Sequence, residues 1–291
     1  MKKMYIMILL LALIMTACGE NNLTNHNDDD PQIDSTYIGT DNTLDIMTWN
    51  IEQFPLSGNN TVDKVINIID TLKLDIIVLQ EIRSLNSFNA VVSALENWDG
   101  YRANSAYYDI NLAVIYNTNT ISINSITEIF TEDWWAFPRN PLVVDFNYNR
   151  QNYIVINNHL KALSGVENEE RREAACDSLK NYIDTNYADN NVILLGDLND
   201  SLTDPECDNV FWQFISDSTH YQFADMSIAN GSSRYWSYPT WPSHLDHILI
   251  TDELFDEWKS GSTLTLLLDN YYDNYIYSVS DHRPVLIKLK L

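Results

Sequence analysis

The chain has 291 residues, of which 45% are hydrophobic and 12% aromatic, enough to bury the core of one large domain. Its formal net charge of -24 argues against tight, nonspecific adhesion to polyanions, but it does not exclude an enzyme that handles phosphates through metal ions. The sequence contains no internal repeat and no second linker, which favours a single domain.

The N-terminus is typical of a secretion signal. Lys2 and Lys3 precede an apolar stretch over residues 4–15 that is too short for a comfortable membrane span. Residues 15–18 resemble a bacterial lipoprotein box, which predicts a lipidated Cys18; ordinary cleavage that leaves Cys18 free is the alternative. We therefore expect a signal peptide over 1–17, a lipidated, disordered tether over 18–43 and a folded domain over 44–291. This predicts a protein of the bacterial cell envelope, attached to the outer membrane through a lipid anchor only.

Two further cysteines, Cys176 and Cys207, lie in the predicted domain. In an oxidising compartment they could form a disulfide or remain separate thiols. The sequence does not decide between the two.

The first half of the domain is predicted to alternate strands and helices. Apolar patterns predict strands over residues 44–49, 75–79, 109–117 and 121–130, and helices over 62–72 and 87–98. We expect the strands 109–117 and 121–130 to be neighbours joined by the turn at 117–119. Residues 134–141 are rich in Trp, Pro and Arg and cannot be regular structure throughout.

The second half shows the same mixture of elements. The predictions are a hairpin of strands 142–148 and 153–158, helices over 167–187 and 209–215, an aromatic loop over 234–242, and strands over 192–195, 245–250 and 285–289. Strands outnumber helices, and each half supplies both. This favours two sheets packed face to face with helices outside.

The stretch from 191 to 200, NVILLGDLND, joins an apolar strand to polar residues. Its branched side chains predict a strand buried on both faces, which Gly196 ends. Asp197 and Asn199 follow two residues apart, so their side chains can point the same way. A carboxylate beside so apolar a run needs a cation or hydrogen bonds to compensate its burial. On this stretch alone, a functional site and a simple Asp/Asn turn both fit.

Polar side chains recur at the ends of the other predicted strands. The set is Asn50, Glu81, His159, Asp197, Asn199, Asp246, Asp281 and His282. Oxygen ligands without a cluster of cysteines suit Mg²⁺, Mn²⁺ or Ca²⁺ rather than structural zinc. Two histidines with acids nearby supply a base to orient water and an acid to protonate a leaving oxygen, as hydrolysis of a phosphate ester requires.

From about residue 44 to the C-terminus, the sequence resembles the endonuclease/exonuclease/phosphatase superfamily in its deoxyribonuclease I-like branch. Six motifs in the family's order carry the resemblance, namely Thr48-Trp49-Asn50, Leu79-Gln80-Glu81, Asn158-His159-Leu160, Gly196-Asp197-Leu198-Asn199, Leu245-Asp246-His247 and Ser280-Asp281-His282-Arg283-Pro284. The resemblance implies an α/β fold of four layers, an αββα sandwich in which helices flank two packed mixed β-sheets. It places the site at one edge of the sandwich.

The resemblance also implies roles for single residues. Glu81 resembles the principal ligand of a Mg²⁺ or Mn²⁺ ion, with Ca²⁺ as a further candidate, and Asn50 and Asp281 resemble the groups that complete the coordination. Asp197 and Asn199 are similar to the pair that orients the attacking water. His282, steered by Asp246, resembles the histidine that contacts the scissile phosphate, and His159 resembles the second catalytic histidine.

Further residues are expected around this centre. The family partners the second histidine with a Glu; here Asp109 stands at the matching distance, and Tyr107 or Tyr108 could substitute. Arg139 matches an Arg-x-Pro that touches phosphate in the same branch. Lys161 could neutralise phosphate or only cover the sheet edge, and Trp134, Trp135 and Trp241 could stack on substrate or pack under their loops. We expect His247 in the core, and His26, His220 and His244 on the surface or in loops.

The sequence therefore predicts a metal-dependent hydrolase of phosphate esters, foremost a phosphodiesterase or nuclease that attacks in line with water. A phosphomonoesterase and a sphingomyelinase-like lipid phosphodiesterase are the alternatives within enzymes. A surface binding module that kept the fold and lost catalysis is the alternative of another class. The expected partner is a phosphate ester of a nucleic acid, nucleotide, sugar or lipid headgroup, bound by a monomer.

Overall fold

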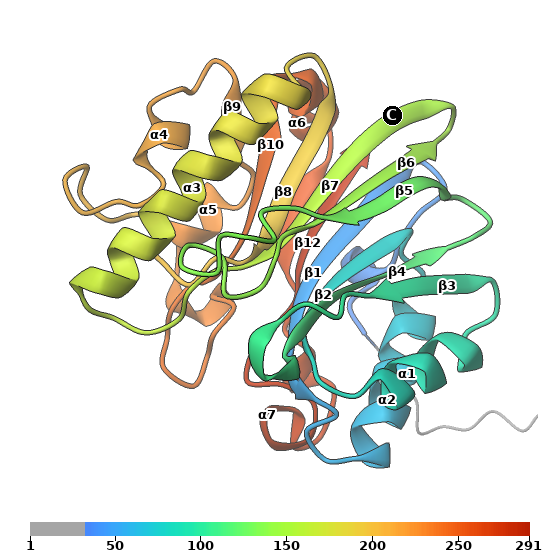
Figure 1. Ribbon diagram of the computed structural model, residues 1–291. Helices are drawn as coiled ribbons and strands as arrows, with labels where there is room; N and C mark the ends of the chain where they lie inside the picture. The colour runs from blue at the N-terminus through green and yellow to red at the C-terminus, as the bar shows by residue number, and fades with distance from the viewer. Residues whose placement is uncertain (1–32) are drawn as a thin grey trace, which may run out of the picture. The chain divides into compact units, whose positions relative to one another are not determined.

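The computed structural model describes residues 33–291, so the predicted signal peptide and Cys18 lie outside the described residues and the lipidation stays a prediction. Within 33–291, every helix is too short or too polar to cross a bilayer. Two six-stranded sheets lie face to face between two groups of helices, as Figure 1 shows. The four-layer αββα sandwich implied by the resemblance is confirmed.

Both sheets are mixed. The first has the order β11 (Ser262–Thr265), β12 (Val285–Lys290), β1 (Thr43–Phe54), β2 (Ile76–Ile82), β4 (Asn111–Asn117) and β3 (Trp98–Arg102). The second has the order β5 (Ser122–Glu128), β6 (Leu142–Tyr148), β7 (Gln151–His159), β8 (Asn191–Asp197), β10 (Asp246–Thr251) and β9 (Tyr221–Phe223). Each sheet has one parallel pair, β1 with β2 and β7 with β8, and these pairs bring consecutive strand ends to one edge.

The helices cover the outer faces of the two sheets. The first sheet carries α1 (Asn59–Leu72), α2 (Leu85–Ala94) and α7 (Tyr275–Ser278), and the second carries α3 (Val166–Asn186), α4 (Trp212–Ile215) and α5 (Met226–Ala229). The remaining short elements are α6 (Phe255–Lys259), η1 (Ser35–Tyr37), η2 (Tyr107–Asp109), η3 (Ser233–Tyr235), η4 (Asp252–Leu254) and η5 (Leu268–Asn270).

The apolar side chains form three cores, one between the two sheets and one between each sheet and its helices. Successive residues of a strand point to opposite faces of the sheet and therefore enter different cores. In β8, Ile193 and Leu195 pack between the sheets, whereas Val192 and Leu194 pack under α3. In β1, Ile46 also faces the other sheet, whereas Met47 packs in the core that includes α1. Because both faces of the central strands are covered, their sequences are almost continuously apolar, and the strand ends are the first places where polar groups can gather.

Four predictions about elements are wrong. The strands at 109–117 and 121–130 are not neighbours: β4 pairs with β2 and β3, whereas β5 pairs with β6, so the turn between them carries the chain from one sheet to the other. The helix predicted to Trp98 ends at Ala94, because residue 98 begins β3. The helix predicted over 209–215 is only α4. The domain starts before Leu44, because the buried Tyr37 accepts a hydrogen bond from the amide of Leu267 at 3.3 Å.

The two cysteines of the domain are free thiols. Cys176 lies on the buried face of α3, and Cys207 is exposed. Of the two alternatives that the sequence left open, the structure therefore supports separate thiols.

A buried carboxylate joins the first two strands of the chain. Asp75 Oδ2 accepts a hydrogen bond from the amide of Asp45 at 2.9 Å, and the side chain of Asp75 is almost fully buried. Burial raises the pKa of Asp75 from 3.8 to about 6. The folded state therefore holds a proton on Asp75 at pH values at which the unfolded chain has released it, so this group destabilises the fold as the pH rises from 4 to 6.

Replacing Asp75 by Asn should remove this pH dependence. Below pH 4 the variant and the natural chain should be about equally stable, and above pH 6 the variant should be more stable by about 3 kcal/mol in urea unfolding. Asp63→Asn, at an exposed position of α1, is the matched control and should leave the stability unchanged both below pH 4 and above pH 6. A stability difference that is constant with pH would contradict the burial effect.

Candidate active site

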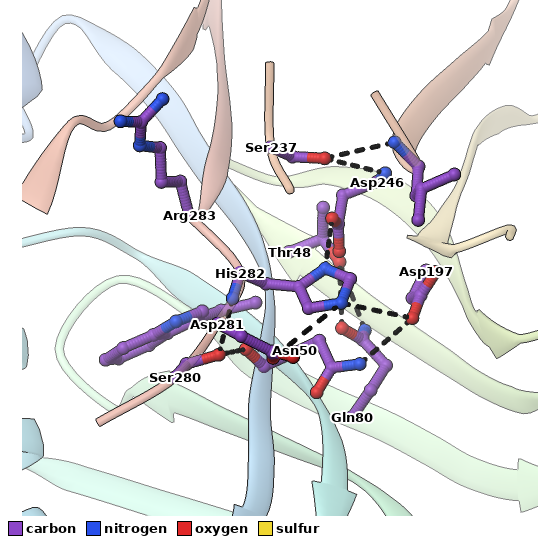
Figure 2. Close-up of polar contacts among 12 residues, drawn as sticks. Thr48, Asn50, Gln80, Asp197, Ser237, Asp246, Ser280, Asp281, His282 and Arg283 are labelled. Atoms are coloured by element: carbon purple, nitrogen blue, oxygen red, sulfur yellow. Dashed lines mark hydrogen bonds and ion pairs between the residues drawn. The ribbon is translucent and has the colours of Figure 1, made fainter. Parts of the chain in front are cut away.

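The two sheets place their polar strand ends against one another. In the second sheet, Asp197 at the end of β8 stands opposite His159 of β7 on one side and Asp246 of β10 on the other. In the first sheet, β1 contributes Asn50, and the segment before β12 contributes His282. Figure 2 shows the His282 ring lying between the carboxylates of Asp246 and Asp197.

Asp197 is the meeting point of these groups. Its Oδ2 accepts a hydrogen bond from Asn50 Nδ2 at 2.9 Å, lies 3.3 Å from His159 Nε2 and lies 3.9 Å from His282 Nε2. Burial raises the pKa of Asp197 to about 7, although His282 and the Asn50 amide counteract the shift. A carboxyl that exchanges its proton near neutral pH is suited to take a proton from water.

His282 is held as a cation. Its Nδ1 lies 2.7 Å from Asp246 Oδ2, and its backbone amide donates to Ser280 Oγ at 2.9 Å. Burial lowers the pKa of a histidine, but Asp246 and then Asp197 outweigh burial here and raise the pKa of His282 to about 10. At neutral pH, His282 therefore presents a positive charge to the group of side chains around Asp197, which we call the centre.

His159 is held neutral. It is fully buried, and its Nε2 points to Asp197 and lies 4.0 Å from Glu81 Oε1. Burial, followed by the positive charges of Arg139 and His282, holds the pKa of His159 well below its usual range. Its Nδ1 atom has no hydrogen-bond partner within residues 33–291. The two histidines thus differ in charge because only His282 has a carboxylate at its Nδ1.

Acidic side chains gather on the side of the centre formed by the first sheet. Glu81 Oε2 accepts from the amide of Gln53 at 2.9 Å, and Glu52 Oε2 accepts from the amide of Asp281 at 3.1 Å. Burial raises the pKa values of Glu52 and Asp281, and the nearby acids raise them further. These oxygens, with the amide oxygen of Asn50, are the hard donors that suit Mg²⁺ or Mn²⁺, and a cation there would offset the mutual repulsion of the acids.

Glu52 was not among the predicted site residues. The sequence suggested that the first strand ends near residue 49, whereas β1 continues to Phe54 through an irregularity at which Glu52 and Gln53 have positive φ. This bulge turns the Glu52 side chain toward Asp281. The acid two residues after Asn50 was the available signal.

Asp109 is not brought to His159. It lies on the exposed turn before β4, where its Oδ1 accepts from Arg102 Nη2 at 2.6 Å and from Asn111 Nδ2 at 2.9 Å. The predicted partnership therefore needs correcting: Asp109 stabilises this turn, and the carboxylate nearest to His159 is Asp197. The strand begins later than predicted, at residue 111, and this places the acid outside the sheet edge.

The other predicted residues surround the centre. Asn199 and Arg139 both donate to the carbonyl of Leu160, at 3.3 and 3.4 Å. Lys161 Nζ donates to the carbonyl of Ala162 at 2.8 Å. Trp241, 78% exposed, lines a hollow that Asn199 also lines.

A second buried cluster lies beyond β10. Asp225 Oδ2 lies 2.6 Å from His247 Nδ1 and 3.0 Å from His244 Nε2, and His247 Nε2 lies 2.9 Å from the carbonyl of Asp200. A nitrogen–oxygen separation of 2.6 Å is that of a direct hydrogen bond, so this cluster is a hydrogen-bonded ion pair with a second histidine. His247 is in the core, as predicted. His244 lies in the loop before β10, one of the two places expected for it, and its side chain is buried against Asp225.

Gly196 is required for the approach of β7 and β8. It has φ of +146°, and a Cβ atom at this position would lie 1.9 Å from the carbonyl oxygen of Asn158. The residue that ends the apolar run therefore lets the strand carrying His159 lie close to the strand carrying Asp197.

Comparison with known proteins identifies the family to which the sequence is similar. Residues 47–282 match the model of the endonuclease/exonuclease/phosphatase family. No curated protein matches the chain.

Several solved structures share the fold at low sequence identity. D. rerio TDP2, humanized by 14 mutations, is 13% identical, with a TM-score of 0.67 over 86% of this chain and 100% of that one. The human nocturnin catalytic domain with bound sulfate is 18% identical, with a TM-score of 0.64 over 86% and 95%. A mannosyl-6-phosphatase of Bacteroides thetaiotaomicron is 14% identical, with a TM-score of 0.63 over 85% and 100%.

Replacing Gly196 by Ala should destabilise the domain. The new methyl group meets a backbone carbonyl, which cannot move without separating β7 from β8, so we expect a loss of roughly 3 kcal/mol or more in the free energy of unfolding. Gly165→Ala is the matched control, since Gly165 also has positive φ but has open space around its Cβ position. Equal losses in the two variants would show that backbone strain alone, and not the close approach, constrains Gly196.

Replacing Asp246 by Asn should lower the pKa of His282. The variant removes the charge closest to the ring and leaves burial opposed only by more distant acids. In metal-free protein, NMR titration of the ring should show the pKa of His282 falling by roughly two pH units or more. Asp225→Asn is the matched control, because Asp225 contacts His244 and His247. A shift of His282 in the control and not in the Asp246 variant would contradict the assignment.

Proposed function

The chain belongs to the endonuclease/exonuclease/phosphatase family, whose members are hydrolases of phosphate esters, and we propose that it is a divalent-metal-dependent phosphodiesterase. One observation carries the proposal. A cationic histidine, a neutral histidine and a carboxyl with a pKa of about 7 converge on the same point as a group of acids, Glu52, Glu81 and Asp281, none of which forms an ion pair with a Lys or Arg of residues 33–291. This arrangement suits a substrate whose phosphate must be neutralised before water can attack it.

Glu81, Asp281 and Asn50 would hold the metal, with Glu52 beside them. Their donor set is made of oxygen atoms, which favours Mg²⁺ or Mn²⁺, and Ca²⁺ is compatible with it. When bound, the ion would supply positive charge to a phosphoryl oxygen.

The side chains of the second sheet would carry the proton transfer. Asp197, held in place by Asn50, orients a water molecule and accepts one of its protons, while Asn199 holds a phosphoryl oxygen. His282 remains protonated against Asp246 and neutralises a second phosphoryl oxygen. His159 donates a hydrogen bond from Nε2 to the leaving oxygen, which takes up a proton from solvent, and Asp197 returns to solvent the proton that it accepted from the attacking water. The products are then a phosphomonoester and an alcohol.

A phosphomonoesterase acting on sugar phosphates is the second candidate. The hollow that contains Trp241 is lined by further aromatic rings and by polar side chains, and one of these rings, that of Tyr238, lies 4.9 Å from the His282 ring. Aromatic faces with neutral hydroxyl groups suit a sugar. The similar solved structure named as a mannosyl-6-phosphatase is consistent with this candidate.

The proposal predicts hydrolysis of bis(4-nitrophenyl) phosphate that EDTA abolishes and Mg²⁺ or Mn²⁺ restores. Glu81→Gln should weaken the response to the metal, and His159→Ala should lower kcat by about 100-fold or more with an unchanged circular dichroism spectrum. His220→Ala, at a surface site with 65% of its side chain exposed, is the matched control and should retain full activity.

Two outcomes would redirect the proposal. Turnover of 4-nitrophenyl phosphate and hexose 6-phosphates without turnover of diesters would establish the second candidate. Binding of phosphate esters without any turnover would support a silent binding module.

A further inference from the structure

A cationic hollow lies beside the active site. It has a volume of about 770 Å³, and its walls include the rings of Tyr108 and Trp134, the aliphatic side chain of Leu163 and three cations, Arg139, Lys161 and Arg171. The cations come from three different segments: the loop before β6, the loop after β7, and α3. A volume of this size accommodates a small organic ligand.

The three cations lack acidic partners, although the chain carries 41 acidic and 17 basic residues. Arg139 donates to the carbonyl of Leu160, Lys161 to that of Ala162 and Arg171 to that of Trp135, and none of them forms an ion pair within residues 33–291. Burial lowers the pKa of Lys161, and the charges of Arg171 and Arg139 lower it further. The group thus repels itself, and a bound anion would relieve that repulsion.

The next residue of the same helix shows the contrast. Arg172 Nε donates to Asp200 Oδ2 at 2.7 Å, and its Nη1 donates to the carbonyls of Lys161 and Leu163. Arg172 is therefore neutralised and fixes the loop after β7. Arg171 donates to the carbonyls of Trp135 at 2.6 Å and Trp134 at 3.5 Å and lies 5.9 Å from the centroid of the Trp135 ring. It forms no ion pair within residues 33–291, so its charge stays uncompensated beside the hollow.

Two of the cations link the hollow to the neighbourhood of His159. Lys161 follows His159 by two residues, and Arg139 is close enough to lower the pKa of His159. A substrate whose scissile phosphate lies at His159 would therefore extend into the hollow by its next chemical group.

Two of the aromatic side chains that line the hollow are largely exposed. Trp134 is 75% exposed and Tyr108 is 77% exposed. An exposed ring offers a face on which a flat heterocycle can stack, as bases stack on aromatic side chains in nucleic-acid complexes.

Resting on the proposed function, we propose that the cationic hollow is a nucleotide subsite: a base of the substrate stacks on Trp134, and a phosphate other than the scissile one binds Arg171 and Lys161. The cationic group of a zwitterionic lipid headgroup would be repelled by the three cations of the hollow. A neutral sugar would carry no charge to compensate these cations. The ligand class that satisfies both the rings and the charges is a nucleotide unit with an additional phosphate.

Titration calorimetry of the protein in magnesium buffer with three probes separates the two contributions. Thymidine 3′,5′-bisphosphate carries both groups, thymidine 5′-monophosphate lacks the second phosphate, and deoxyribose 5-phosphate lacks the base. We expect each loss to weaken binding by about tenfold. Arg171→Gln should abolish the advantage of the bisphosphate, and Trp134→Ala should abolish the advantage of the base.

The controls address charge and loop position. Arg150→Gln removes the same charge at the exposed turn between β6 and β7, at the opposite end of β7 from His159, and should leave the order of the probes unchanged. Arg171→Lys retains the charge and should retain most of the bisphosphate advantage. If Arg171 acts only by holding the Trp135 carbonyl, Arg171→Lys will behave as Arg171→Gln does, and the phosphate assignment is overturned.

Further outcomes would overturn the subsite as a whole. Equal affinity for the three probes, or tighter binding of phosphocholine than of thymidine 5′-monophosphate, would do so. Turnover of bis(4-nitrophenyl) phosphate tests the proposed function independently of these binding measurements. Diester turnover with equal probe affinities contradicts the subsite alone, whereas the expected order of probes without diester turnover contradicts the phosphodiesterase alone.

Discussion

The burial of one carboxylate, that of Asp197, is the constraint on which the rest of the site depends. An isolated ionised carboxylate in this position would cost several kcal/mol, so donors must reach it from both sheets. Asn50 comes from the first sheet, His159 from the neighbouring strand of the second sheet, and His282 from the segment before β12. The interaction therefore fixes the relative position of the two sheets at the edge where the chemistry would occur.

The same constraint explains why two histidines only a few ångströms from one carboxylate differ in charge. His282 has Asp246 at its second nitrogen, whereas the second nitrogen of His159 faces no partner among the described residues. The ion pair with Asp246 keeps His282 a cation, and desolvation keeps His159 neutral, across the physiological pH range. A hydrolase of phosphate esters can use both states at once, one for charge and one for hydrogen bonding.

Much of this arrangement could be predicted from the sequence because strand ends are local. Asp197, Glu81 and His159 each come two or three residues after the last apolar residue of a run, so their placement at a sheet edge needs only the strand itself. Glu52 escaped prediction because a bulge in β1 turns it inward, and Asp109 was misplaced because β4 begins two residues later than expected. The pairing of β5 with β6 also depends on tertiary contacts, since a short turn can join two sheets as readily as two neighbouring strands.

The local distribution of charge also depends on tertiary contacts and therefore could not be predicted from the sequence. The net charge of -24 describes the average field, and from it one would not expect a cationic hollow. Arg171 and Arg172 are consecutive, yet successive residues of a helix point about 100° apart, so one reaches Asp200 and the other faces the hollow. Only the fold decides which of two identical side chains is neutralised. A cationic hollow on a chain of strongly negative net charge would leave long polyanions repelled by the rest of the protein and attract short phosphate esters toward the candidate site.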